Sequence, residues 1–261
     1  MRKFTILVVM VAILISMGVA QAAGELDVST AGSSGQIGVA WFYWNDPAVS
    51  TGTGNFDPFL SIDNHTYTVW EQGYNYDFDK THPTEYDEIT GGDRTHSLLL
   101  TTVPTVYIGT DPYREFRIDV NQSANGPLTL DTLRIYTSSA PLYGYDSSAW
   151  APNLVYDMGE DYFVRMSGQT GSGSGDMRLL VPSDSFTGTY VTMYSVMGDV
   201  PWAVITDPER FASNDGFEEW GVITGEQPPP LIPEGSSILL ALSSLPTVGM
   251  LGWLRRKRQS G

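Results

Sequence analysis

The clearest pattern in the chain is a strict alternation of apolar and polar side chains between residues 113 and 121. Phe116, Ile118 and Val120 share one parity. The opposite parity is polar and carries Glu115, Arg117, Asp119 and Asn121. Because successive side chains of a strand point to opposite faces, this segment predicts a β-strand with one buried and one solvent-facing side.

A second strand is predicted over residues 128–135, with an irregularity in its middle. Leu128 and Leu130 share one parity, whereas Leu133 and Ile135 have the other. A single extra residue at Asp131-Thr132 would return all four side chains to the same face. The pattern therefore predicts a β-bulge or a short break at this point.

Further short apolar runs predict strands over residues 97–100, 103–108, 162–166, 177–181, 190–196 and 217–223, with one or two more over 61–70. Gly, Pro, Asn and Asp punctuate them, as in 171–175 and 214–216. No window of ten residues in this region combines a 3.6-residue period with helix caps. The pattern predicts one all-β domain over residues 23–230, a jelly-roll-like antiparallel β-sandwich, with a barrel as the open alternative.

The beginning of this domain is less regular. Residues 24–35 are small and polar, which is typical of a flexible lead-in. Residues 36–44 then predict one strand with Ile37, Val39, Trp41 and Tyr43 on its inward face. Residues 71–95 have no sustained period, and a long irregular loop in a compact domain is either functional or disordered.

Both ends of the chain have the patterns of transport signals. Arg2 and Lys3 precede an apolar run, and Ala20-Gln21-Ala22 matches a small-x-small cleavage site. Residues 1–22 therefore predict a cleaved signal peptide. At the other end, the 17 residues from Ile238 to Leu254 carry no charge and are followed by Arg255-Arg256-Lys257-Arg258. That order predicts a short membrane-spanning helix with a cytoplasmic basic end.

The motif before this helix is Pro233-Glu234-Gly235. Residues 231–261 as a whole resemble the PEP-CTERM sorting signal, although glycine replaces the second proline of the tripeptide. The resemblance implies export through the inner membrane of a Gram-negative bacterium, processing at the motif by an exosortase, and a final place at the cell surface or in the extracellular matrix. An ordinary C-terminal membrane anchor is the alternative. Several segments, Arg114–Gln122 among them, also resemble a recurring ectodomain of exosortase substrates, which supplies no catalytic residues.

Charge is uneven between the ends and the domain. The ends hold six of the 14 basic residues and one of the 30 acidic residues, so residues 23–230 carry a net charge near −21, against −16 for the whole chain. Such a surface disfavours nucleic acid, because phosphate binding needs clustered Lys and Arg. The chain has no cysteine, which excludes thiol chemistry and requires the core to hold the fold without disulfides.

Catalytic motifs are absent from the sequence. His65, His82 and His96 form no His-Glu-x-x-His pattern, and no Gly-x-Ser-x-Gly elbow occurs. Carboxylate pairs for glycoside cleavage are defined by their separation in space, which a sequence does not give. We therefore expect a non-enzymatic protein without an obligatory cofactor.

Two loops carry candidate binding residues. The irregular stretch contains Asp77, Asp79, Asp87 and Asp93, whose oxygens are typical calcium ligands, although a solvated acidic loop is the simpler interpretation. A Gly- and Ser-rich loop contains Tyr143, Tyr145 and Trp150, whose rings could stack on sugars or pack inside the domain.

Together these patterns predict an exported surface or matrix protein, associated with extracellular polysaccharide or biofilm. Its partners would be signal peptidase, an exosortase and a polysaccharide, with membrane contact through the C-terminal helix before processing. The alternative is a secreted carbohydrate-binding or glycoside-cleaving protein on the same jelly-roll scaffold.

Overall fold

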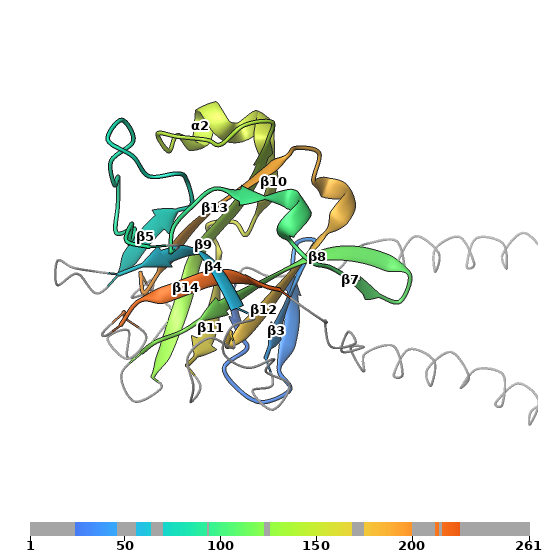
Figure 1. Ribbon diagram of the computed structural model, residues 1–261. Helices are drawn as coiled ribbons and strands as arrows, with labels where there is room; N and C mark the ends of the chain where they lie inside the picture. The colour runs from blue at the N-terminus through green and yellow to red at the C-terminus, as the bar shows by residue number, and fades with distance from the viewer. Residues whose placement is uncertain are drawn as a thin grey trace, which may run out of the picture.

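The computed structural model describes residues 24–45, 56–63, 70–92, 94–122, 126–168, 175–199, 212–213 and 216–224. They form two β-sheets that face each other across an apolar core (Figure 1). In these ranges helical structure is limited to single turns: α2 (Ser147–Trp150), η2 (Leu100–Thr102), η4 (Ala151–Asn153) and η5 (Ser183–Ser185). None of them is long and apolar enough to span a membrane. The prediction of an all-β, sandwich-like domain is confirmed.

The first sheet, sheet A, has the strand order β1-β11-β9-β13-β5, with β10 beside β9 and β6 beside β13. Its strands are β1 (Gly24–Asp27), β5 (Glu71–Tyr74), β6 (Leu98–Leu99), β9 (Pro127–Ser138), β10 (Leu154–Asp157), β11 (Tyr162–Ser167) and β13 (Tyr190–Met197). Its ladders are antiparallel except that of β1 with β11, which is parallel. The expected purely antiparallel sandwich is therefore wrong at this edge, because no hairpin joins these two distant segments and fixes their direction.

The second sheet, sheet B, has the order β2-β3-β12-β8-β14-β4, with β7 beside β8. Its strands are β2 (Ser34–Ile37), β3 (Ala40–Trp44), β4 (Phe56–Ile62), β7 (Thr105–Ile108), β8 (Asp111–Asp119), β12 (Met177–Pro182) and β14 (Glu218–Ile223). All of its ladders are antiparallel. The chain crosses from sheet B to sheet A between β8 and β9, and β11 to β14 alternate between the sheets.

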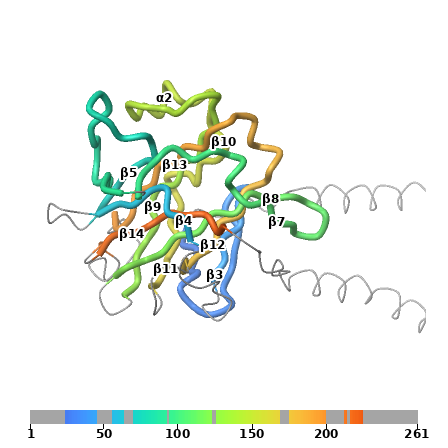
Figure 2. The backbone as a smooth tube through the Cα atoms, in the orientation of Figure 1, coloured from blue at the N-terminus to red at the C-terminus, as the bar shows by residue number. Residues whose placement is uncertain are grey.

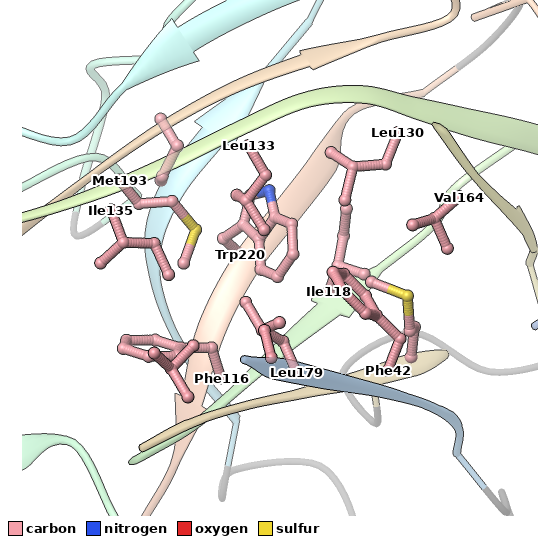
Figure 3. Close-up of a cluster of buried hydrophobic side chains, with 14 of the residues drawn as sticks. Phe42, Phe116, Ile118, Leu130, Leu133, Ile135, Val164, Leu179, Met193 and Trp220 are labelled. Carbon is pink, nitrogen blue, oxygen red and sulfur yellow. The ribbon is translucent and has the colours of Figure 1, made fainter. Parts of the chain in front are cut away.

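The core lies between the two sheets and is built from the inward parity of each strand. Figure 3 shows Trp220 of β14 between side chains of both sheets, with Leu133 of β9 on one side and Leu179 of β12 on the other. Trp220 is fully buried, and its indole Nε1 donates to Ser195 Oγ of β13 at 3.2 Å. That bond satisfies the one polar atom of the ring and ties sheet B to sheet A inside the core.

The alternation in β8 is confirmed on its apolar side, where Phe116 and Ile118 are buried in the core together with Val120 just beyond the strand. The expectation of a wet opposite face is wrong. Glu115, Arg117 and Asp119 are all buried, although Asn121 is half-buried. Parity identifies which side faces the core but does not reveal that Arg178 of β12 pairs with Glu115 on the other side.

The irregularity in β9 is confirmed as a bulge. The strand is continuous, and its register against β13 shifts so that Val196 lies opposite Thr132 and Met197 opposite Leu130. Asp131 is therefore the extra residue. Leu128, Leu130, Leu133 and Ile135 all lie in the same core cluster, as the change of phase predicts.

The N-terminal segment differs from the expectation. The supposed lead-in contains β1 and the start of β2, and residues 36–44 form a hairpin rather than one strand. Gly38 occupies the turn with φ of 60°, a conformation that glycine adopts without steric cost. The turn reverses the parity, so Phe42 faces the core, whereas Trp41 and Tyr43 lie in a second cluster with Leu180. Val39 is half-exposed in the turn.

The region after β4 also differs. The strand expected over residues 61–70 is instead β4, which ends at Ile62, and residues 64–69 lie outside the described ranges. β5 follows, and a long stretch without strands then leads to β6. Both β5 and β6 pair with the same edge of β13, so this stretch is a loop inserted between two pieces of one sheet edge.

Candidate functional site

The outer face of sheet A carries a cluster of aromatic side chains. Its members are Tyr74, Tyr76, Tyr86, Tyr136, Tyr143, Tyr145, Trp150 and Tyr194, which we call the aromatic cluster. Strands β5, β9 and β13 supply three of them, and the rest come from the loop after β5 and the loop that contains α2. Figures 1 and 2 show these two loops at the same end of the molecule, above β5 and β13.

Tyr145 is the centre of the cluster. Its ring stacks on that of Tyr194, with centroids 3.9 Å apart and planes 11° apart, and it meets Trp150 edge-on at 5.1 Å. The Tyr145 hydroxyl accepts a hydrogen bond from Arg134 Nη1 at 3.1 Å. Offset stacks and T-shaped pairs are the preferred arrangements of aromatic rings, so the cluster is well packed.

Trp150 is positioned by a short helical turn. Asp146 Oδ1 accepts from the backbone N–H groups of Ser148 and Ala149, which is the usual role of an N-cap aspartate. The turn places the Trp150 ring against Tyr136, with centroids 5.4 Å apart, and leaves it only 5% exposed. Trp150 therefore packs the domain, whereas Tyr143 and Tyr145 are half-buried and keep part of their rings accessible.

Glu85 joins the two loops above the cluster. Its carboxylate accepts from the backbone N–H groups of Gly144 and Tyr145, each at 3.1 Å, and from the Tyr74 hydroxyl at 2.7 Å. Burial and the adjacent Glu85 carboxylate raise the pKa of Tyr74. Tyr74 therefore stays a neutral donor, and the loop that carries Tyr143 is held in place.

His82 lies against the accessible part of the cluster. Its ring lies on that of Tyr143, with centroids 3.8 Å apart and planes 23° apart. Asp79 orients this histidine, because its Oδ1 contacts His82 Nδ1 at 3.1 Å. Hydrogen bonds from the Thr81 side chain and from the Thr81 and His82 backbone lower the pKa of Asp79 to about 2. The result is a stacked ring pair beside an exposed carboxylate, a combination that can contact the face and hydroxyl groups of a sugar.

Three of the four aspartates expected to bind calcium lie in the described ranges, and they make separate contacts. Asp77 Oδ1 accepts from Ser97 N, Asp79 Oδ1 from Thr81 and His82, and Asp87 Oδ2 from Gln72 N. Asp93 lies outside the described residues. The described part of the chain contains no group of three or more His, Asp or Glu side chains arranged to hold a metal ion. The geometry therefore lends no support to the calcium prediction.

A different pair of carboxyl groups meets inside the domain. Glu71 of β5 and Glu218 of β14 have no exposed surface, and their side chains are hydrogen-bonded to each other. Sequence reasoning missed this pair. Glu218 shares the parity of Trp220 and Val222, which was the available sign that it points inward. Glu71 gave no comparable sign, because β5 is short and begins an irregular stretch.

The residues expected to direct transport and processing, which are 1–22, Pro233, Glu234, Gly235, Arg255, Arg256, Lys257 and Arg258, lie outside the described ranges. Comparisons with protein-family models, with curated proteins and with solved structures give no match for this chain.

Proposed function

We propose that this chain is an exported, non-enzymatic protein of the cell surface or extracellular matrix that associates with extracellular polysaccharide. It would lose residues 1–22 to signal peptidase. Its C-terminal segment, residues 231–261, would hold it in the membrane until an exosortase processes it at Pro233-Glu234-Gly235. The mature part is a single domain on a jelly-roll-like scaffold, in keeping with the alternation of β11 to β14 between the sheets.

The observation that carries the proposal is the position of the fold relative to the two processing points. β1 begins at Gly24, two residues after the predicted signal peptide, and β14 ends at Ile223, ten residues before Pro233. Both sheets therefore lie between the expected cleavage sites, and neither cleavage would remove a strand that the structure describes.

Processing is tested by replacing Pro233 and Glu234 with alanine in the producing cell. Because the motif directs cleavage in this proposal, the variant should stay in the membrane fraction at its unprocessed mass. The matched control is Glu226→Ala with Pro229→Ala, which changes the same residue types outside the motif and should be processed normally. Intact-mass measurement decides between them. A released wild-type protein that still contains Leu254 and Arg255 would contradict the proposal.

Polysaccharide contact is assigned in this proposal to the accessible rim of the aromatic cluster, at Tyr143 and Tyr145. The stack of His82 on Tyr143 supports this choice, because it presents a broad ring surface next to the Asp79 carboxylate. Tyr143→Ala should weaken retention on the cell's own polysaccharide in affinity electrophoresis. Tyr107→Ala is the control, since Tyr107 is 53% exposed on β7 and lies outside the cluster. Equal retention of both variants and the wild type would rule out this surface.

The alternative is a carbohydrate-binding protein without surface sorting. It would use the same ring surface but would not be processed at its C-terminus, so the intact-mass measurement distinguishes it from the proposal. A glycoside-cleaving enzyme is less well supported. Such an enzyme needs two carboxyl groups that reach the substrate. Glu71 and Glu218 do not meet this need, because both side chains are wholly buried.

A further inference from the structure

Glu71 and Glu218 lie where the two sheets meet at one edge of the sandwich. Glu71 is the first residue of β5 and points inward from sheet A, on the same side as Gly73. Glu218 is the first residue of β14 and points inward from sheet B, on the same side as Trp220. Their hydrogen bond therefore crosses from one sheet to the other. It is a contact between two acidic groups shielded from bulk solvent, because both side chains are completely buried.

The hydrogen bonds around the pair define what lies between them. Glu71 Oε2 accepts from Ser213 Oγ at 3.2 Å, and Glu218 Oε1 accepts from Gln122 Nε2. The other two oxygens, Glu71 Oε1 and Glu218 Oε2, receive no hydrogen bond from any donor group. They are the oxygens left for the contact between the two side chains. Since ionised carboxylates only accept hydrogen bonds, that contact requires a proton on one of them.

We propose that Glu71 and Glu218 share one proton and that this proton fastens the β5 edge of sheet A to β14 of sheet B. The protonated carboxyl group donates to its ionised neighbour, so the pair carries one negative charge. Removing the proton would place two like charges against each other in a buried site. The contact would then change from attraction to repulsion, and this edge of the sandwich would loosen.

The surroundings favour the protonated pair. Burial is the main cause that raises the pKa of both groups. The charged groups that act most strongly on the pair are Asp87, in the loop after β5, and Asp63, at the end of β4, and both are negative. They oppose ionisation further.

The direction of the pH effect follows from these shifts. The native pair keeps a proton at pH values where the unfolded chain, with glutamates near their usual pKa of 4.5, has lost it. The stabilising contribution is therefore complete below pH 4.5 and declines as the pH rises through the raised pKa of the pair. For an exported protein, the pH of the surroundings would then control how tightly this edge is closed.

Infrared spectroscopy of the purified protein at pH 7 tests the proton itself. Glu218→Gln keeps the shape, and its amide can donate to Glu71 without a titrating proton. It should remove one protonated-carboxyl C=O band, and Glu71→Gln should remove the same band. Glu160→Gln, at a fully exposed position, should remove none. If the two variants leave the protonated band unchanged, the pair is ionised and the proposal fails.

Hydrogen exchange tests the fastening. The quantity compared is the protection factor of the amides of β5 and the start of β14, corrected for intrinsic exchange, at pH 5 and at pH 9. Its decrease over this pH range should be at least tenfold larger in the wild type than in Glu218→Gln. Parallel profiles would overturn the proposal.

A second arm compares EDTA with added calcium. If calcium raises the melting temperature of the wild type and leaves that of Glu218→Gln unchanged, a cation rather than a proton lies between the carboxylates.

Discussion

Truncation of Glu115 tests whether the polar face of β8 is part of the interior. Glu115 is 1% exposed and forms ion pairs with two arginines. Its Oε1 accepts from Arg117 Nε and Arg178 Nε, each at 2.8 Å, and its Oε2 accepts from Arg178 Nη2 at 3.0 Å. Glu115→Ala would leave two buried guanidinium groups without this carboxylate. Breaking a buried pair in this way costs about 3–5 kcal/mol of unfolding free energy.

The matched control is Glu25→Ala at the edge of sheet A. Glu25 pairs with Arg165 at 2.7 Å, a distance as short as those of Glu115, but its side chain is 30% exposed. Exposed pairs contribute about 0–1 kcal/mol, so this variant should be close to the wild type. Urea unfolding followed by tryptophan fluorescence measures both, because Trp220 becomes exposed only when the core opens. Salt should reduce the small effect of Glu25→Ala and leave that of Glu115→Ala nearly unchanged. Equal costs for the two variants would refute the buried network.

Three further predictions concern the stability of the domain, and the first two use the same urea unfolding assay whereas the third uses thermal melts. Asn75→Ala should destabilise by about 2–4 kcal/mol, because its side chain accepts from Met193 N and donates to Val191 O and His96 O, and two of these backbone groups lie on β13. Burial raises the pKa of Asp131 to about 7. The wild type should therefore lose stability relative to Asp131→Asn as the pH rises from 3.8 to 7, by at most about 1.4 kcal/mol per pH unit. If the acidic loop binds calcium, calcium should raise the melting temperature above that in EDTA more than magnesium does, and identical melts would exclude it.

The sequence predicted those features of the fold that depend on local parity. The apolar side of β8 follows from three alternating residues, and the bulge at Asp131 follows from a change of phase between leucines. Both rest on the period of two along a strand, which persists whatever the partner strand is. The short strands β11 to β14 were found for the same reason.

Features that depend on contacts between distant segments were not predictable in this way. The buried state of Glu115 requires Arg178, which is 63 positions away and adjacent only after β12 pairs with β8. The turn at Gly38 escaped detection because apolar residues continue at odd positions through Val39, Trp41 and Tyr43, although the residues that face the core change from odd to even positions at the turn. Trp150 is buried because its ring packs against Tyr136 of β9. The Gly- and Ser-rich sequence around Trp150 contains no local pattern that indicates this contact. In the candidate site, the sequence identified the aromatic residues of the loop. It did not predict how their side chains pack.

The acidic loop shows how a charged composition can serve the fold itself. β5 pairs with β13 along one edge, and the backbone N–H groups of Gln72 and Tyr74 point to the other. Asp87 Oδ2 accepts from Gln72 N at 3.0 Å, and Glu88 Oε1 accepts from Tyr74 N at 3.2 Å. An unpaired edge of this kind is a template for association with another chain. The two carboxylates, together with the backbone hydrogen bond from Asp87 N to Gln72 O at 3.1 Å, cover this edge without a further strand. Asp87 and Glu88 therefore have a structural role at this edge that needs no bound cation.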